Sequence, residues 1–79
     1  MADIKTEQLA NYAHKAWSGW MKFLFEQSKH NADGTITIPL WAAIRWHRQC
    51  NTEYKDLPEH EKESDLAEAR KILDVMETK

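Results

Sequence analysis

Residues 30–39 decide how this chain is divided, and they read His30-Asn31-Ala32-Asp33-Gly34-Thr35-Ile36-Thr37-Ile38-Pro39. Asp33-Gly34 tolerates the positive φ angles that tight turns require, so a preceding helix should end here. The β-branched residues at 35–38 favour an extended backbone over a helix. Pro39 disfavours helix in the residue before it and suits the first turn of a new helix. The stretch therefore predicts a short strand or extended arm at 35–38, between two helices.

Upstream of the turn, apolar side chains recur three and four residues apart, as they do on one face of a helix. They are Leu9, Tyr12, Ala13, Ala16, Trp17, Trp20, Met21 and Leu24. This spacing predicts a helix over about 6–29. Phe23 and Phe25 flank the stripe, so we expect the second half of this helix to be enclosed by the rest of the chain.

Downstream of the turn, the pattern predicts a helix over about 39–50 and another over about 58–77. The last of these carries an inward stripe of Leu66, Ala69, Ile72, Leu73 and Met76. We therefore predict a mostly α fold, namely a compact three-helix domain spanning 1–79 with the short strand or extended arm between its first two helices.

The chain has 79 residues, which is enough for one small core. Four Trp, two Phe and two Tyr residues supply bulky apolar surface for a chain of this length. The plainest interpretation of these side chains is an aromatic-rich core.

The net charge is −2 and the pI is about 6.0, so no overall positive field attracts nucleic acid or an anionic membrane. The lone thiol, Cys50, excludes an internal disulfide and suits a reducing compartment. No leader-like start and no membrane-spanning run of apolar residues is visible. We expect a cytosolic protein.

None of the candidate catalytic residues has the full set of neighbouring groups that catalysis needs. His47 lies one helical turn before Cys50, but a nucleophile also needs a third, orienting group, and none is identifiable. The other histidines are scattered, which argues against a metal site, and the two glycines form no phosphate-binding loop. We expect a protein that is not an enzyme and that needs no cofactor.

The middle helix carries aromatic and basic side chains together, at Trp41, Arg45, Trp46 and Arg48. Such a face could bind a partner, since Trp and Arg are enriched in the residues that dominate interface energetics. Alternatively, a tryptophan packs in the core and the arginines pair with the acidic last helix. A DNA-reading helix is a weaker interpretation, because such domains are usually basic overall.

A further pattern involves both ends of the chain. It consists of Leu9-Ala10, Ala13-His14 and Trp17, followed by Tyr54, Leu57, Glu61-Lys62, Asp65 and Ala69. In these residues the chain resembles the ryanodine-receptor repeat domain, whose short versions also occur as stand-alone proteins in bacteria and phages. Along nearly its whole length it also resembles small phage and prophage proteins of unassigned function.

The resemblance to the repeat domain is partial. Gly19-Trp20 matches only part of the family's Gly-Trp and Tyr-Gly pattern, Leu66 stands where an arginine often follows the aspartate, and residues 30–50 do not align. The resemblance implies a helical binding module for a nucleotide-derived ligand. Its pocket would use His14, Trp17, Tyr54 and Lys62 for stacking and charge recognition. Alternatively, Trp17 is a core residue and Lys62 pairs with Asp65 on the helix surface.

Together these features predict a small non-enzymatic phage-type or prophage-type binding module, whose partner is a host protein or a small nucleotide-derived ligand. A self-assembling accessory protein, such as a homodimer, is the alternative, followed by a DNA-binding regulator. Exposed Trp41 and Trp46 would favour a protein partner, whereas burial of both around a concave site would favour a small ligand.

Overall fold

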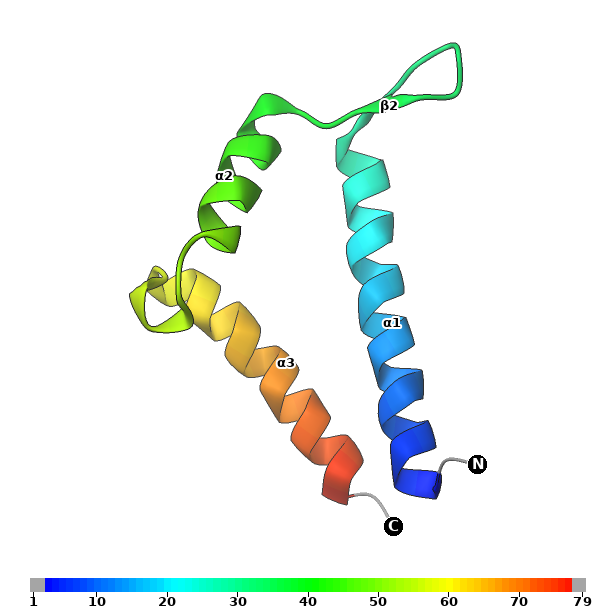
Figure 1. Ribbon diagram of the computed structural model, residues 1–79, viewed down its shortest axis with the longest axis vertical. Helices are drawn as coiled ribbons and strands as arrows, with labels where there is room; N and C mark the ends of the chain where they lie inside the picture. Colours follow the sequence, from blue (N-terminus) through cyan, green and yellow to red (C-terminus); the bar gives the residue numbers. More distant parts are fainter. Residues whose placement is uncertain (1–2, 78–79) are drawn as a thin grey trace.

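A computed structural model describes residues 3–77 of the chain, which form three α-helices and a two-stranded antiparallel hairpin. The elements follow the order α1 (Ile4–Gln27), β1 (Lys29–His30), β2 (Ile36–Thr37), α2 (Leu40–Cys50), a 3₁₀ turn η1 (Tyr54–Asp56) and α3 (Glu59–Glu77) (Figure 1). The predicted mostly α fold, with an extended segment between the first two helices, is confirmed.

α1 begins two residues earlier than the apolar stripe predicts. The Asp3 carboxylate caps it by accepting a hydrogen bond of 2.7 Å from the Thr6 amide. At the other end, the Ser28 hydroxyl donates to the Leu24 carbonyl at 2.7 Å, and the chain then becomes extended. α1 therefore ends at Gln27, because Lys29–His30 leave the helix to pair with β2.

The hairpin follows the predicted turn. Lys29 pairs with Thr37 and His30 with Ile36. Gly34 adopts a φ of 90°, a conformation that side chains disfavour, and its amide donates to the Asn31 carbonyl at 3.1 Å. The Asp33 carboxylate accepts from the Thr35 amide at 3.0 Å, which fixes the tip of the turn.

α2 and α3 both begin directly after a proline. The Pro39 carbonyl accepts hydrogen bonds from the amides at the start of α2, and the Pro58 carbonyl does the same for α3. A proline cannot donate a backbone hydrogen bond, so a position at the start of a helix loses nothing. The irregular segment between the two helices contains η1.

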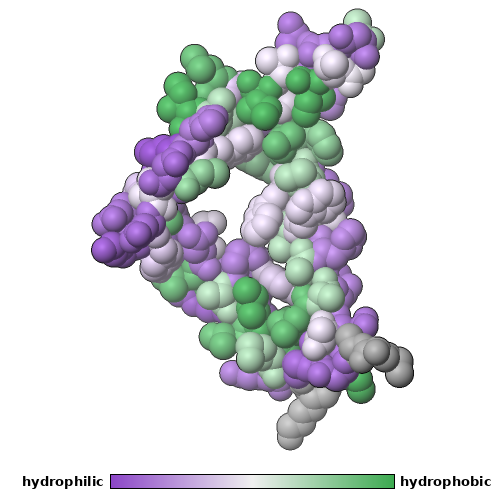
Figure 2. Space-filling view, viewed as in Figure 1, coloured by the Kyte–Doolittle hydropathy of each residue, from purple (hydrophilic) through white to green (hydrophobic). Residues whose placement is uncertain are grey.

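The helices form an open frame instead of a compact bundle, which corrects the expected compact domain. α1 and α3 lie side by side only where α1 begins and α3 ends, and they diverge towards α2 and the hairpin (Figure 1). The frame measures 46 × 34 × 17 Å and has a radius of gyration of 16.0 Å. A compact chain of this length would have a radius of gyration of about 12 Å. A gap passes through the middle of the space-filling view (Figure 2).

The expected aromatic-rich core is also wrong. Within residues 3–77, Ala42 is the one apolar residue that is buried. Trp17 and Trp20, both expected to face inward, have exposed fractions of 55% and 60%. The physical reason is the shape: helices arranged in one layer leave each apolar stripe without a second layer to cover it.

Polar contacts join α1 to α3. The Lys5 ammonium donates to the Val75 carbonyl at 3.0 Å, and the Tyr12 hydroxyl donates to the Glu68 carboxylate. The Glu68 hydrogen bond raises the pKa of Tyr12 to about 12, because it holds the proton on the phenol. The same bond lowers the pKa of Glu68. In the described part of the chain, no helix is both long enough and apolar enough to span a bilayer.

Candidate binding site

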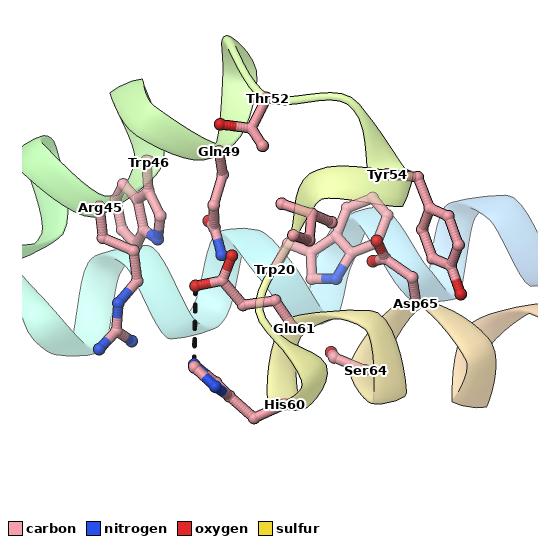
Figure 3. Close-up of a pocket in the computed structure, with 11 residues that line it drawn as sticks. Trp20, Arg45, Trp46, Gln49, Thr52, Tyr54, His60, Glu61, Ser64 and Asp65 are labelled. Carbon is pink, nitrogen blue, oxygen red and sulfur yellow. Dashed lines mark ion pairs between the residues drawn. The ribbon is translucent and has the colours of Figure 1, made fainter.

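A recess of about 550 Å³ lies where α2, η1 and α3 meet and is closed on one side by a side chain from α1 (Figure 3). This volume is in the range of ordinary ligand sites. Its lining residues are Trp20, Arg45, Trp46, Gln49, Thr52, Tyr54, Leu57, His60, Glu61, Ser64 and Asp65.

Glu61 is the buried polar group of this recess, with an exposed fraction of 7%. The Arg48 guanidinium donates two hydrogen bonds to its carboxylate, at 3.2 and 2.5 Å. These bonds, with a further one from Gln49, lower the pKa of Glu61, although burial works in the opposite direction. His60 Nε2 lies 3.6 Å from Glu61 Oε2 (Figure 3). Glu61 therefore stays ionised and ties the end of α2 to the start of α3.

Aromatic rings form the walls of the recess. Trp20 reaches into it from α1, Trp46 stands on the α2 side, and Tyr54 stands on the η1 side (Figure 3). The Lys62 ammonium lies 5.9 Å from the centre of the Tyr54 ring, which is within cation–π range. The recess thus combines flat aromatic faces with the carboxylates of Glu61 and Asp65.

The aromatic and basic residues predicted on α2 fall into two groups. Trp41 and Trp46 meet edge to face with their ring centres 6.4 Å apart, and the Arg45 guanidinium lies 5.3 Å from the centre of the Trp41 ring. Arg48 is instead engaged by Glu61. The alternative considered for the arginines, pairing with the acidic last helix, therefore describes Arg48 but not Arg45.

The outer face of α2, which we define as Leu40, Trp41, Ile44 and Arg45, is exposed. Leu40, Trp41 and Ile44 have exposed fractions of 75%, 45% and 61%, whereas Ala42 on the opposite side has 0%. Apolar side chains gather over the start of this helix in the space-filling view (Figure 2). α2 therefore turns its smallest apolar side chain inward and its largest ones outward.

The residues carried over from the family resemblance do not form one pocket. On α1, His14 stacks on Trp17 with ring centres 6.3 Å apart, and the second pair is Tyr54 with Lys62. Of these four residues, Tyr54 alone lines the recess. Leu57 and Asp65, which also match the family pattern, line it too.

Of the residues that line the recess, sequence reasoning named Arg45, Trp46 and Tyr54 as site residues and missed the others, Trp20 and Glu61 among them. Gly19-Trp20 is part of the family pattern and could have indicated the tryptophan. Glu61 belongs to the same pattern, but nothing in the sequence separates its carboxylate from those of Glu59 and Glu63 beside it. Only its position opposite Arg48 distinguishes it from exposed neighbours such as Glu63.

His47 and Cys50 share a separate shallow groove with Ile38, Ala43 and Trp46. The Cys50 thiol is exposed. Within the described range 3–77, no three His, Cys, Asp or Glu side chains are grouped closely enough to hold a metal ion.

Comparison of the chain with protein-family models, with curated proteins and with solved structures found no match.

Proposed function

We propose that this chain is a non-catalytic module that binds a protein partner through the outer face of α2. The observation that carries this proposal is the orientation of α2, with Ala42 buried and Leu40, Trp41 and Ile44 exposed beside Arg45. A helix that served only its own fold would turn these large apolar side chains inward.

The composition of this face indicates the chemistry of the partner. Tryptophan and arginine are enriched in the interface residues that contribute most binding energy. Trp41 offers a flat apolar surface, and the Arg45 guanidinium above its ring offers a cation. A matching protein surface has an apolar groove with a carboxylate at its edge.

The resemblance to small phage and prophage proteins adds a source for the partner, which would be a protein of the bacterial host, met in its cytoplasm. The notion of a DNA-binding regulator gains no support from α2, since Arg48 is engaged by Glu61 and Arg45 lies over Trp41.

Site-directed photo-crosslinking in bacterial cells that produce the chain tests the proposal. Trp41 is replaced by p-benzoylphenylalanine, and Ala67, exposed on α3, is replaced in the same way as the control position. We expect a discrete adduct with another protein from position 41 and not from position 67. Mass spectrometry of the adduct then identifies the partner for a binding measurement with both purified proteins.

A charge-reversal pair makes this test specific. Arg45→Glu should abolish the adduct and weaken purified binding at least tenfold, because it places a carboxylate against the partner's carboxylate. Lys55→Glu makes the same change of charge at another exposed position and should leave both readouts unchanged. The same adducts from positions 41 and 67, or an adduct that Arg45→Glu leaves intact, would overturn the proposal.

The recess supports a second candidate function, the binding of a small aromatic ligand. Trp20 and Tyr54 offer faces for stacking a base, and the lining also carries the Arg45 cation and the Asp65 carboxylate. Adenosine and adenosine monophosphate therefore distinguish a site that binds the base alone from one that also binds a phosphate group. Titration of the protein with adenosine and with adenosine monophosphate, followed by tryptophan fluorescence, tests this. Binding of the nucleoside that Trp20→Ala removes would support the candidate, and no fluorescence change with either compound would contradict it.

A further inference from the structure

The helices lie in one layer, since none covers another in the view down the shortest axis of the chain (Figure 1). The chain measures 17 Å along that axis. Stable domains consist of at least two packed layers around a core. In residues 3–77 this layer buries one apolar residue, Ala42. The fold therefore lacks its second layer.

The surface that a second layer would cover can be expressed as an area. The chain exposes 6609 Å², and a compact monomer of its 9.3 kDa mass exposes about 5,000 Å². Each chain thus carries an excess of about 1,600 Å². Two copies that covered all of this excess would bury about 3,200 Å² in total, which is an upper limit because the outer face of α2 is part of the excess. An interface of half that area is still of the standard size for a stable complex.

The α1–α3 groove is a mostly apolar part of this uncovered surface. Leu9, Ala13, Ala16 and Trp20 of α1 line it, with Tyr12 engaged by Glu68 and with Ile72 across the groove. Leu73 and Met76 extend the apolar surface along α3 and are both more than half exposed. Figure 2 shows hydrophobic side chains gathered over this end of α3. The one charged group of this lining, the Glu68 carboxylate, accepts a hydrogen bond from Tyr12 and lies 3.5 Å from the Lys71 ammonium.

The α1 side of the groove is complementary to itself. Leu9, Ala13, Ala16 and Trp20 repeat at intervals of four, three and four residues, which is the spacing of a helix–helix seam. Trp20 is large and 60% exposed, while Ala13 and Ala16 leave room beside it. When two such helices cross in an antiparallel manner near Ala16, each Trp20 faces Ala13 of the other copy. Large side chains opposite small ones are what close packing requires.

We propose that the second layer is a second copy of this chain, which packs its α1–α3 groove against the first around a two-fold axis near Ala16. A two-fold axis brings the same patch of both copies together, so the self-complementary α1 stripe suits it. The outer face of α2 is not part of this interface. The dimer and the binding function of that face can therefore fail independently.

Sedimentation equilibrium of the full chain tests this assignment. The wild type should show twice the 9.3 kDa chain mass, and Ala13→Arg should show the mass of one chain, because it places a long cation at the centre of the seam. Ala67→Arg is the matched control, since Ala67 is exposed on α3 outside the groove. This variant should remain a dimer.

Cysteine cross-linking gives a second readout that does not depend on how well Ala13→Arg folds. In a Cys50→Ser background, Ala16→Cys should form an intermolecular disulfide on mild oxidation, because the two-fold axis brings both copies of residue 16 together. Ala67→Cys should form at least tenfold less of the intermolecular disulfide under the same conditions. A wild type that sediments as one chain, an assembly that Ala13→Arg leaves unchanged, or equal cross-linking from positions 16 and 67 would overturn the proposal.

Discussion

Arg48 and Glu61 hold the end of α2 against the start of α3 through a two-bonded ion pair, with Nη1–Oε1 and Nη2–Oε2 distances of 3.2 and 2.5 Å. The carboxylate is buried, while the arginine is partly exposed. The parallel geometry uses the fixed fork of the guanidinium, which is why lysine would not replace it. This pair sets the angle between two sides of the open frame.

Glu61→Gln should lower the thermal midpoint of unfolding, because it leaves the Arg48 guanidinium with a neutral acceptor at a buried position. Glu63→Gln, an exposed substitution of the same kind on the same helix, is the control and should shift the midpoint much less. Circular dichroism during a thermal scan measures both. Equal shifts in the two variants would mean that the ion pair contributes no more than an ordinary surface charge.

The loss of stability at acidic pH should also arise from the Arg48–Glu61 ion pair. Arg48 lowers the pKa of Glu61 below its ordinary value of 4.5. The folded chain therefore binds the Glu61 proton less readily than the unfolded chain does, so this contribution is complete above that ordinary value and is lost as the pH falls through the folded pKa. Urea unfolding from neutral to acidic pH should show a loss of stability that Glu61→Gln reduces. A wild type and a variant with parallel acid profiles would contradict this.

The hydrogen bond between Tyr12 and Glu68 should make stability depend on pH in the alkaline range as well. Glu68 raises the pKa of Tyr12 from 10.0 to about 12. The stabilisation from their hydrogen bond is therefore complete below the unfolded value and disappears as the pH rises through about 12. A spectrophotometric titration of tyrosinate should show a late step that is absent from Tyr12→Phe. If the late step persists in that variant, it belongs to another group.

Replacement of each of the two glycines by alanine should change the stability of the protein in opposite directions. Gly34→Ala places a side chain at a φ of 90° and should cost about 1–2 kcal/mol of stability. Gly19 lies inside α1 with nothing within 4 Å of an added Cβ, so Gly19→Ala should stabilise the protein by about 1 kcal/mol through helix propensity. Chemical denaturation of both variants measures the difference. Shifts of the same sign would show that the hairpin turn or α1 does not have this conformation in solution.

Local chemistry explains why the elements were predictable. Asp33-Gly34 and Pro39 act on their own backbone and their immediate neighbours, so the turn, the extended segment and the start of α2 follow from residue type alone. β1 was missed because Lys29–His30 has no strand signal of its own and becomes extended only by pairing with Ile36–Thr37. The early start of α1 depends on Asp3, whose capping role is visible only with its geometry.

The arrangement of the helices was not predictable in the same way. Periodicity identifies Trp17 and Trp20 as members of an apolar stripe, but it does not say whether another helix of the same chain covers that stripe. The same limit applies to the site. The sequence left open whether Arg45 and Arg48 bind a partner or pair with the acidic helix, and only the position of Glu61 separates the two arginines.

The contacts between α1 and α3 also bear on how the protein is made. Lys5 and Val75 are 70 positions apart, and Tyr12 and Glu68 are 56 positions apart. At ordinary rates of translation, the start of α1 is synthesised roughly 3–14 s before its neighbour in α3. During that interval Leu9, Tyr12 and Ala16 of α1 have no α3 to lie against. The nascent chain is therefore a natural client for chaperones that shield apolar segments, and its yield in cells should depend on them more than its small size suggests.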